Sequence, residues 1–200
     1  LLEREAMALN LGFIKRMKTG MPWVTVKLAS SLDGKTALNN GESQWITGPL
    51  AREDVQRHRA QSCAILSGSG TVLADNPSLN VRYSELGFAK NALAEVNLRQ
   101  PVRVLLDGRN QMRLHDVMKH LGQRGFNQIW VEAGAKLAGA LLQNKLIDEL
   151  ILYQAPKLLG DKGRDLFAVD ELTQMQQAFE LQWQDVRQVG PDLKLTARFT

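Results

Sequence analysis

The residues in this sequence that could do chemistry stand mostly where short apolar runs end. Four runs are followed by small or polar residues, at Ser30–Gly34, Gly68–Thr71, Asp107–Gly108 and Ala133–Lys136. Because glycine has no side chain, a ligand can approach the backbone closely at such positions. One glycine-containing loop is a weak signal, but four together favour a nucleotide-binding protein.

Two of these loops resemble known phosphate-binding patterns only in part. Gly68-Ser69-Gly70 begins like a dinucleotide fingerprint, but Leu73 stands where the third glycine belongs. The segment from Gly134 to Gly139 has the spacing of a phosphate loop without its Gly-Lys-Ser/Thr ending. It does open a predicted helix directly after a strand, so its free backbone N–H groups could hold a diphosphate. The alternative is a tight turn whose small residues serve packing.

Two charged residues belong to predicted strands. Glu132 ends the apolar run Ile129–Val131, and a buried carboxylate is costly unless it is paired. Its position favours a functional site over simple solvation. Lys27 lies on the face of its strand opposite Val24, Val26 and Leu28. Lys27 could belong to a functional site or could lie exposed on an edge strand, and the sequence favours neither alternative.

One arginine lies on the apolar stripe of a predicted helix. Ala51 and Val55 are separated by one helical turn, and Arg59 continues their stripe. An inward-facing arginine indicates an anionic partner, and its planar fork suits a phosphate. The alternative is a side chain that extends past the helix end into solvent. Arg82 and the histidines, His58 among them, have no such context and are expected at the surface.

Composition narrows the class of protein. The 200 residues carry a net charge of +4, and the basic residues are mixed with acidic ones and do not alternate with aromatic rings. This argues against a nucleic-acid groove. One cysteine and three histidines argue against a structural zinc site and fit the reducing cytoplasm. We expect Cys63 to be a small buried apolar residue. No segment has the pattern of a membrane helix or a signal peptide.

The elements that must position these residues alternate between strand and helix. We expect helices over residues 2–17, 47–61 (with Thr47 as its cap), 115–121 and 134–145, and a polar loop over 68–82. Strands are expected over 23–29, 128–132 and 150–155, and buried strands over 63–67 and 102–106. A hairpin over 181–189 and 193–199 closes the chain. The pattern predicts an α/β fold, with a mostly parallel sheet flanked by helices and an antiparallel C-terminal edge. Such sheets bind ligands at the carboxyl ends of their strands, where the glycine loops lie.

The segment Lys27–Thr36 resembles the Lys-x-Ala-x-Ser-Leu-Asp-Gly-Lys/Arg motif of the riboflavin-pathway reductases. Further segments agree with that family in order, at Gly41–Thr47, Thr71–Pro77, Trp130–Gly134 and Ala155–Gly160. The chain is therefore similar, over almost its whole length, to the reductase half of the bifunctional riboflavin-biosynthesis deaminase-reductase. Residues 1–20 resemble the helix that joins the two halves, which leaves 21–200 as the reductase domain.

The resemblance implies a fold like that of dihydrofolate reductase. It also implies the NADPH-dependent reduction of 5-amino-6-(5-phosphoribosylamino)uracil to its ribityl form by a homodimer, with hydride passing to C1 of the ribosylamino group after ring opening to an imine. The implied cofactor contacts are Ala29, Trp45, Thr71, Asp75, Gly108, Gly134, Ala135, Lys136, Leu137, Ala138, Gly139 and Ala140. The implied substrate contacts are Ser43, Arg59, Leu79, Arg82 and Glu132, with the two arginines on the phosphate. Lys27 and Glu132 are the candidates for orienting the substrate or relaying a proton.

The sequence departs from the family in two places. It has no His-x-Glu and no Pro-Cys-x-x-Cys motif, so we expect neither zinc nor zinc-dependent deamination in this chain. The family has roughly forty more residues between Asn110 and Val117, enough for a further strand, and no residue is assigned to the cofactor's 2′-phosphate. Two alternatives stay open: a related pterin or pyrimidine reductase, and a non-catalytic basic module that binds nucleic acid in a salt-dependent way.

Overall fold

The computed structural model describes residues 2–87, 98–108 and 113–199. Seven strands form one sheet in the order β4-β3-β5-β1-β6-β9-β8. Their bounds are β1 Trp23–Ser31, β3 Ala64–Gly68, β4 Val102–Leu106, β5 Gln128–Glu132, β6 Glu149–Ala155, β8 Leu181–Val189 and β9 Asp192–Phe199. The strands from β4 to β6 in this order are parallel, whereas β9 and β8 are antiparallel. This confirms the predicted fold class, including its antiparallel C-terminal edge.

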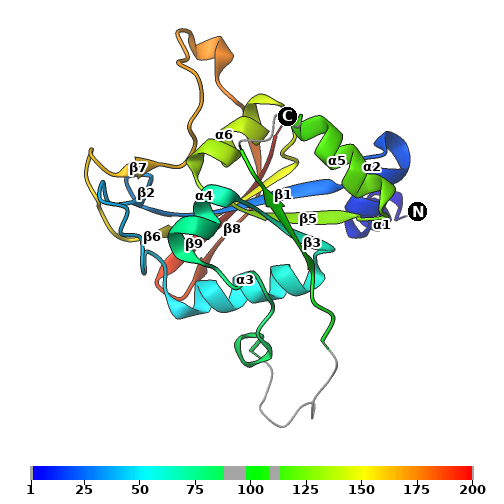
Figure 1. The fold of residues 1–200 in the computed structure, drawn as a ribbon, viewed down its shortest axis with the longest axis horizontal. Coiled ribbons are helices and arrows are strands. Elements are labelled where there is room, and N and C mark those ends of the chain that lie inside the picture. The colour runs from blue at the N-terminus through cyan, green and yellow to red at the C-terminus, as the bar shows by residue number, and fades with distance from the viewer. Residues whose placement is uncertain (1, 88–97, 109–112, 200) are drawn as a thin grey trace.

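Helices cover both faces of the sheet (Figure 1). The helix α3 (Pro49–Gln61) lies on one face, and α5 (Leu114–Gln123) and α6 (Ala135–Gln143) lie on the other. The remaining elements are α1 Glu3–Leu9, α2 Leu11–Thr19, α4 Ser69–Asp75, the 3-10 turns η1 Tyr83–Glu85 and η2 Met175–Gln177, and a small two-stranded sheet of β2 Lys35–Ala37 and β7 Arg164–Asp165. The sequence did not predict this small sheet.

Two hydrophobic clusters lie on opposite faces of the sheet. Val24, Val26 and Leu28 of β1 are buried against α5 and α6, as the alternation of this strand predicted. On the other face, Trp130 and Tyr153 are fully buried with the helix residues of α3. The predicted inward stripe of Ala51, Val55 and Arg59 on α3 is confirmed by the burial of all three residues.

Several local predictions were wrong. The helix expected over 2–17 is divided at Asn10, whose backbone N–H bonds to Met7 instead of continuing the first helix. The expected polar loop over 68–82 begins with the short helix α4, which ends where Asn76 adopts a left-handed conformation. Gly48, not Thr47, caps α3. Cys63 is only half-buried.

The strand expected to be buried over 102–106 is instead an edge strand. In β4, the side chain of Leu105 is 54% exposed and that of Val102 is 43% exposed. Within the part of the chain that the structure describes, this strand pairs only with β3. An apolar run of five residues does not reveal whether a strand has neighbours on one side or on two.

The helix α2 packs closely against the domain. Lys15 forms an ion pair of 2.6 Å with Asp148, and Arg16 donates a hydrogen bond of 2.6 Å to Asn127. A Cβ atom at Gly12 would lie 2.5 Å from the carbonyl oxygen of Asn127, so only glycine fits there. The assignment of residues 1–20 to a connection with another domain stays a prediction.

One part of the sheet lacks a helical cover in the described residues. On the face of α6, the strands β6, β9 and β8 form an apolar hollow of about 190 Å³, lined by Leu150, Leu152, Leu181, Trp183, Leu195 and Ala197. Trp183 is 63% exposed. An exposed apolar surface of this kind commonly marks a protein interface. Within the described residues, no helix is long and apolar enough to cross a membrane.

Candidate active site

The carboxyl ends of the parallel strands meet at one large cleft. Its volume is about 2120 Å³, well above the ~300–1,000 Å³ of a typical small-molecule pocket, so it has room for two ligands side by side. Residues after β3, β4 and β5 line it, as the strand-end argument predicted, whereas the Ser30–Gly34 segment does not; β1 contributes Lys27, Leu28 and Ala29 from within the strand. The small sheet of β2 and β7 contributes Thr36, Ala37, Arg164 and Asp165 to its wall.

The glycines of the cleft leave space for a ligand. Among the described residues, a Cβ atom at Gly70 or Gly108 would meet nothing within 4 Å, and one at Gly134 would approach only the Thr71 hydroxyl, at 3.9 Å. None of the three has a positive φ. Neither packing nor backbone conformation therefore requires glycine at these positions, whereas close approach of a ligand would. These loops fit a dinucleotide.

The Gly134 loop is joined to the Gly68 loop. The backbone N–H of Gly134 donates to the Thr71 hydroxyl at 3.3 Å, while the N-terminal residues of α6 line the cleft as far as Leu137, together with Ala140. Ala138 and Gly139 lie away from the cleft, because Ala138 is fully buried and a Cβ at Gly139 would lie 1.9 Å from the Ala168 oxygen. All the other predicted site residues line the cleft.

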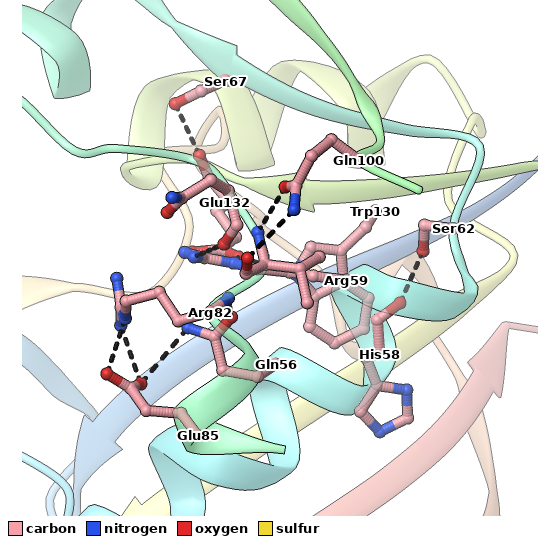
Figure 2. Close-up of polar contacts among 12 residues, drawn as sticks. Gln56, His58, Arg59, Ser62, Ser67, Arg82, Glu85, Gln100, Trp130 and Glu132 are labelled. Carbon is pink, nitrogen blue, oxygen red and sulfur yellow. Dashed lines mark hydrogen bonds and ion pairs between the residues drawn. The ribbon is translucent and has the colours of Figure 1, made fainter. Parts of the chain in front are cut away.

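A buried ion pair lies at the floor of the cleft (Figure 2). Arg59 donates from Nε and Nη2 to the two carboxylate oxygens of Glu132, at 2.6 and 2.8 Å. The Trp130 indole also donates to Glu132, at 2.7 Å. Burial alone would raise the pKa of Glu132, but Arg59, Lys27 and Trp130 outweigh it and lower that pKa. The anion indicated by the inward Arg59 is thus, within the protein itself, a carboxylate.

Lys27 completes this cluster. It lies opposite Glu132 in the parallel register of β1 and β5 and lines the cleft. Burial lowers the pKa of Lys27 from its ordinary value of 10.5, and the positive charge of Arg59 lowers it further, while Glu132 opposes both. A buried lysine with a lowered pKa can exchange a proton closer to neutral pH.

A second arginine–carboxylate pair lies at the surface of the cleft. Arg82 donates to both oxygens of Glu85, at 2.5 and 2.8 Å, and its side chain is 42% exposed. The buried Gln56 of α3 accepts from the Arg82 backbone N–H at 3.0 Å and donates to Glu85 at 3.3 Å. As Figure 2 shows, Gln56 ties this pair to the helix that carries Arg59.

The Asp33 carboxylate holds two of the quoted motifs together. It accepts hydrogen bonds from the backbone N–H groups of Leu159 and Gly160 and from the Ser31 hydroxyl. The hydrogen bonds from Ser31 and then Leu159 lower the pKa of Asp33 to about 2. The Asp-Gly of the first motif thus has a structural role that its sequence context did not predict.

The remaining predicted contacts lie around the rim and walls. Trp45 is 63% exposed and stacks with the Arg52 guanidinium at 4.5 Å from its ring centre. Leu79 is buried beside α3, and Ser43 and Asp75 line the cleft. The sequence missed Arg52 and Gln56, which lie next to the inward stripe of α3 and had no signal beyond that. Among the described residues, no group of three or more histidine, cysteine, aspartate or glutamate side chains could hold a metal ion.

Comparison with known proteins shows which family the chain belongs to. A family model described as the RibD C-terminal domain matches residues 22–195. The chain belongs to this family. It is 44% identical to the riboflavin biosynthesis protein RibD of Haemophilus influenzae, over 98% of this chain and 63% of the relative. It is 34% identical to a protein of Buchnera aphidicola subsp. Acyrthosiphon pisum named 5-amino-6-(5-phosphoribosylamino)uracil reductase, over 79% of this chain and 97% of the relative.

Solved RibD structures share the fold. Acinetobacter baumannii RibD superimposes with a TM-score of 0.88 at 37% identity, covering 99% of this chain and 64% of that one. The chain thus spans just under two thirds of the Haemophilus and Acinetobacter RibD proteins. The alignment with the Haemophilus protein extends over 238 positions, although this chain has 200 residues. That relative therefore has residues without a counterpart here, as the resemblance implied. The difference was expected between Asn110 and Val117, and the first part of that segment, up to residue 112, lies outside the described residues.

Proposed function

We propose that this chain reduces 5-amino-6-(5-phosphoribosylamino)uracil to 5-amino-6-(5-phosphoribitylamino)uracil with NADPH, in riboflavin biosynthesis. The observation that carries the proposal is the cluster of Lys27, Arg59 and Glu132 at the floor of a cleft lined by glycine loops. Two cationic groups face one carboxylate there. Because an excess buried cation is costly, the cluster is suited to an anionic or electron-rich ligand.

The glycine half of the cleft is where we place NADPH. Gly70, Gly108 and Gly134 would let the dinucleotide approach the backbone, and the first N–H groups of α6 would hold its diphosphate. NADPH, when bound, supplies a hydride. The loops orient the dinucleotide and exclude water from it, which is the usual contribution of a protein to cofactor chemistry.

The arginine half is where we place the substrate. Arg82, whose pair with Glu85 is exposed, can exchange that partner for a phosphate. Arg59 retains N–H groups beyond those that Glu132 and the Asn80 carbonyl accept. Reduction of an imine also requires a proton at nitrogen. Lys27 is the proton donor that we propose, because its pKa is lowered, whereas Glu132 is held ionised and serves to orient.

Turnover tests the proposal directly. The purified chain, mixed with NADPH and the phosphoribosylamino-uracil, is expected to consume one NADPH for each ribityl product formed, as followed by absorbance and mass spectrometry. NADPH oxidation with a dihydropterin or another pyrimidine, but not with this substrate, would instead support a related reductase. Salt-dependent nucleic-acid binding without NADPH binding would indicate a non-catalytic module.

We also propose that the chain forms a homodimer in the cytoplasm. The strands β6, β9 and β8 carry an apolar hollow, and a two-fold dimer would cover it with an identical surface. Sedimentation at micromolar concentration should show a dimer, and Trp183→Glu should convert it to monomer because a carboxylate would be buried at the interface. A monomeric parent protein would contradict this proposal.

A further inference from the structure

A second buried polar cluster lies between α3 and the antiparallel side of the sheet. Lys194 of β9, whose side chain is 3% exposed, forms an ion pair of 2.6 Å with Asp54 of α3. The Tyr153 hydroxyl of β6 donates to the same carboxylate oxygen at 2.5 Å. Burial alone would raise the pKa of Asp54, but His58, Lys194 and Tyr153 outweigh it and hold that pKa well below its usual range. The carboxylate is therefore a charged anchor for its neighbours.

His58 connects this cluster to the site. Lys194 Nζ lies 2.7 Å from His58 Nε2, and the same nitrogen lies 3.7 Å from the Asp54 carboxylate. The imidazole then lies flat on the Trp130 indole, with ring centres 4.8 Å apart and planes inclined by 5°. A histidine expected at the surface is thus held on both sides.

Trp130 carries the connection to the carboxylate at the floor of the cleft. Its Nε1 donates to Glu132 Oε1 at 2.7 Å, the same oxygen that accepts from Arg59 Nε. Trp130 itself is almost completely buried, and Glu132 is 16% exposed. Figure 2 shows the Trp130 ring between His58 and Glu132. An unbroken series of contacts therefore joins β9 to the Arg59–Glu132 pair.

We propose that His58 is a positioning residue for the Arg59–Glu132 pair. Held by Lys194 and Asp54, its ring keeps the indole of Trp130 in the orientation that directs Nε1–H to Glu132. His58 does not touch the substrate or the cofactor in this account. As far as catalysis is concerned, the inference rests on the proposed reductase function; the geometric part concerns Trp130 and Glu132 alone.

A double-mutant cycle tests the catalytic part. His58→Ala should lower kcat/KM for the phosphoribosylamino-uracil by about two- to tenfold, the value of one hydrogen bond, with little change in the Kd of NADPH. Trp130→Phe keeps a ring for stacking but has no N–H to direct. In a Trp130→Phe background, His58→Ala should therefore add little further loss. If the two losses multiply instead, His58 acts independently of Trp130 and the proposal is wrong.

Lys15→Met is the matched control. It removes another ion pair of 2.6 Å between largely buried side chains, Lys15 and Asp148, away from the cleft. Lys194→Met should reduce kcat/KM about as His58→Ala does, whereas Lys15→Met should leave it unchanged even where both variants lower Tm. Equal losses of activity in the two lysine variants would show a general effect of stability and overturn the proposal.

A spectroscopic measurement separates this inference from the proposed function. The indole N–H resonance of Trp130 can be identified by its absence from the ¹H–¹⁵N spectrum of Trp130→Phe. Lys194→Met leaves His58 and Trp130 in the chain, so a shift of that resonance reports reorientation of the stack, and Lys15→Met should not cause it. An unmoved resonance in Lys194→Met overturns the proposal. If the resonance moves but the parent protein does not oxidise NADPH with the substrate, the proposed function fails and the positioning holds.

Discussion

The two arginine–carboxylate pairs of the cleft have the same chemistry and different surroundings. Arg59 and Glu132 are 10% and 16% exposed, and they share their environment with Lys27 and Trp130. Arg82 and Glu85 are 42% and 34% exposed, within one short turn of chain. Both pairs form two parallel hydrogen bonds. Burial, not the pairing itself, sets what each pair can do.

A buried pair resists separation, because removing one partner leaves a charge with no solvent to stabilise it. An exposed pair is worth little to stability, since water can replace either partner. The Arg59–Glu132 pair is therefore suited to hold geometry at the floor of the cleft. Arg82 is suited to release Glu85 when a phosphate arrives. Variants of the buried cluster and of the exposed pair test this division.

The largest effect is expected from Lys27→Met. Loss of the proton donor should lower kcat by about 10²-fold or more with little change in KM. The same variant should be as stable as the parent or more so, because it removes a cation whose pKa burial has lowered. Parallel measurement of kcat and of urea unfolding checks both; a large loss of stability would contradict our account of Lys27.

The pH profile of the parent protein sharpens the same point. If the Lys27 ammonium gives up the proton, kcat/KM must fall as pH rises through the lowered pKa of Lys27, below the ordinary 10.5. Glu132 must be ionised, so any acid limb that it causes lies below its ordinary 4.5. The fall in kcat/KM at high pH that we assign to Lys27 should disappear in Lys27→Met. A limb that remains unchanged would assign the proton to another group.

Arg59→Ala comes next and should affect both stability and activity. It leaves the buried Glu132 without its main partner, which should lower the free energy of unfolding by about 3–5 kcal/mol. Substrate kcat/KM should fall by about ten- to hundredfold. Arg59→Lys should restore only part of each, because an ammonium keeps the charge but cannot form both hydrogen bonds. Full recovery in the lysine variant would show that charge alone suffices.

Arg82→Ala should act on substrate binding and not on the fold. We expect KM to rise by about tenfold, the lower end for a charge-assisted hydrogen bond, while the free energy of unfolding changes by less than about 1 kcal/mol. Steady-state kinetics and urea unfolding distinguish this from Arg59→Ala. If the two arginine variants lose equal stability, the contrast between the pairs fails.

The smallest effect is expected from Glu85→Gln. The hydrogen bond from Arg82 lowers the pKa of Glu85, so this carboxylate is charged and competes with a phosphate. When Glu85 loses its negative charge, Arg82 is more available to the substrate phosphate, and KM should fall by no more than about fivefold. A rise in KM would mean that Glu85 holds Arg82 in its binding position instead of competing for it.

The sequence predicted the parts of the site that depend on local periodicity. The helical stripe placed Arg59 inward, and the strand ends placed Glu132 and Gly134 at the cleft, as observed. It could not pair Arg59 with Glu132, because the two lie far apart in the chain and meet only through the strand order of the sheet. For that reason the sequence indicated two separate site residues, Arg59 and Glu132, where the structure has one ion pair.

The predictions that were wrong have the same physical cause, namely contacts between segments far apart in the chain. His58 was expected at the surface because an imidazole on a helix has no apolar signature, and its partners come from β5 and β9. The strand β4 was expected to be buried, and only the non-sequential strand order places it at an edge. The hairpin of β8 and β9 was predicted, but not the partners that Lys194 meets beneath it.

Equilibrium binding of NADPH tests the division of the cleft most directly. Gly134→Val places a branched side chain in the open space where the dinucleotide should approach, in a backbone conformation that valine can adopt. Arg82→Ala changes only the half assigned to the substrate. We predict that Gly134→Val raises the Kd of NADPH at least tenfold, which corresponds to roughly the energy of one or two lost hydrogen bonds. Arg82→Ala should leave the Kd of NADPH unchanged. An unchanged Kd in folded Gly134→Val, or equal weakening in both variants, would contradict the account.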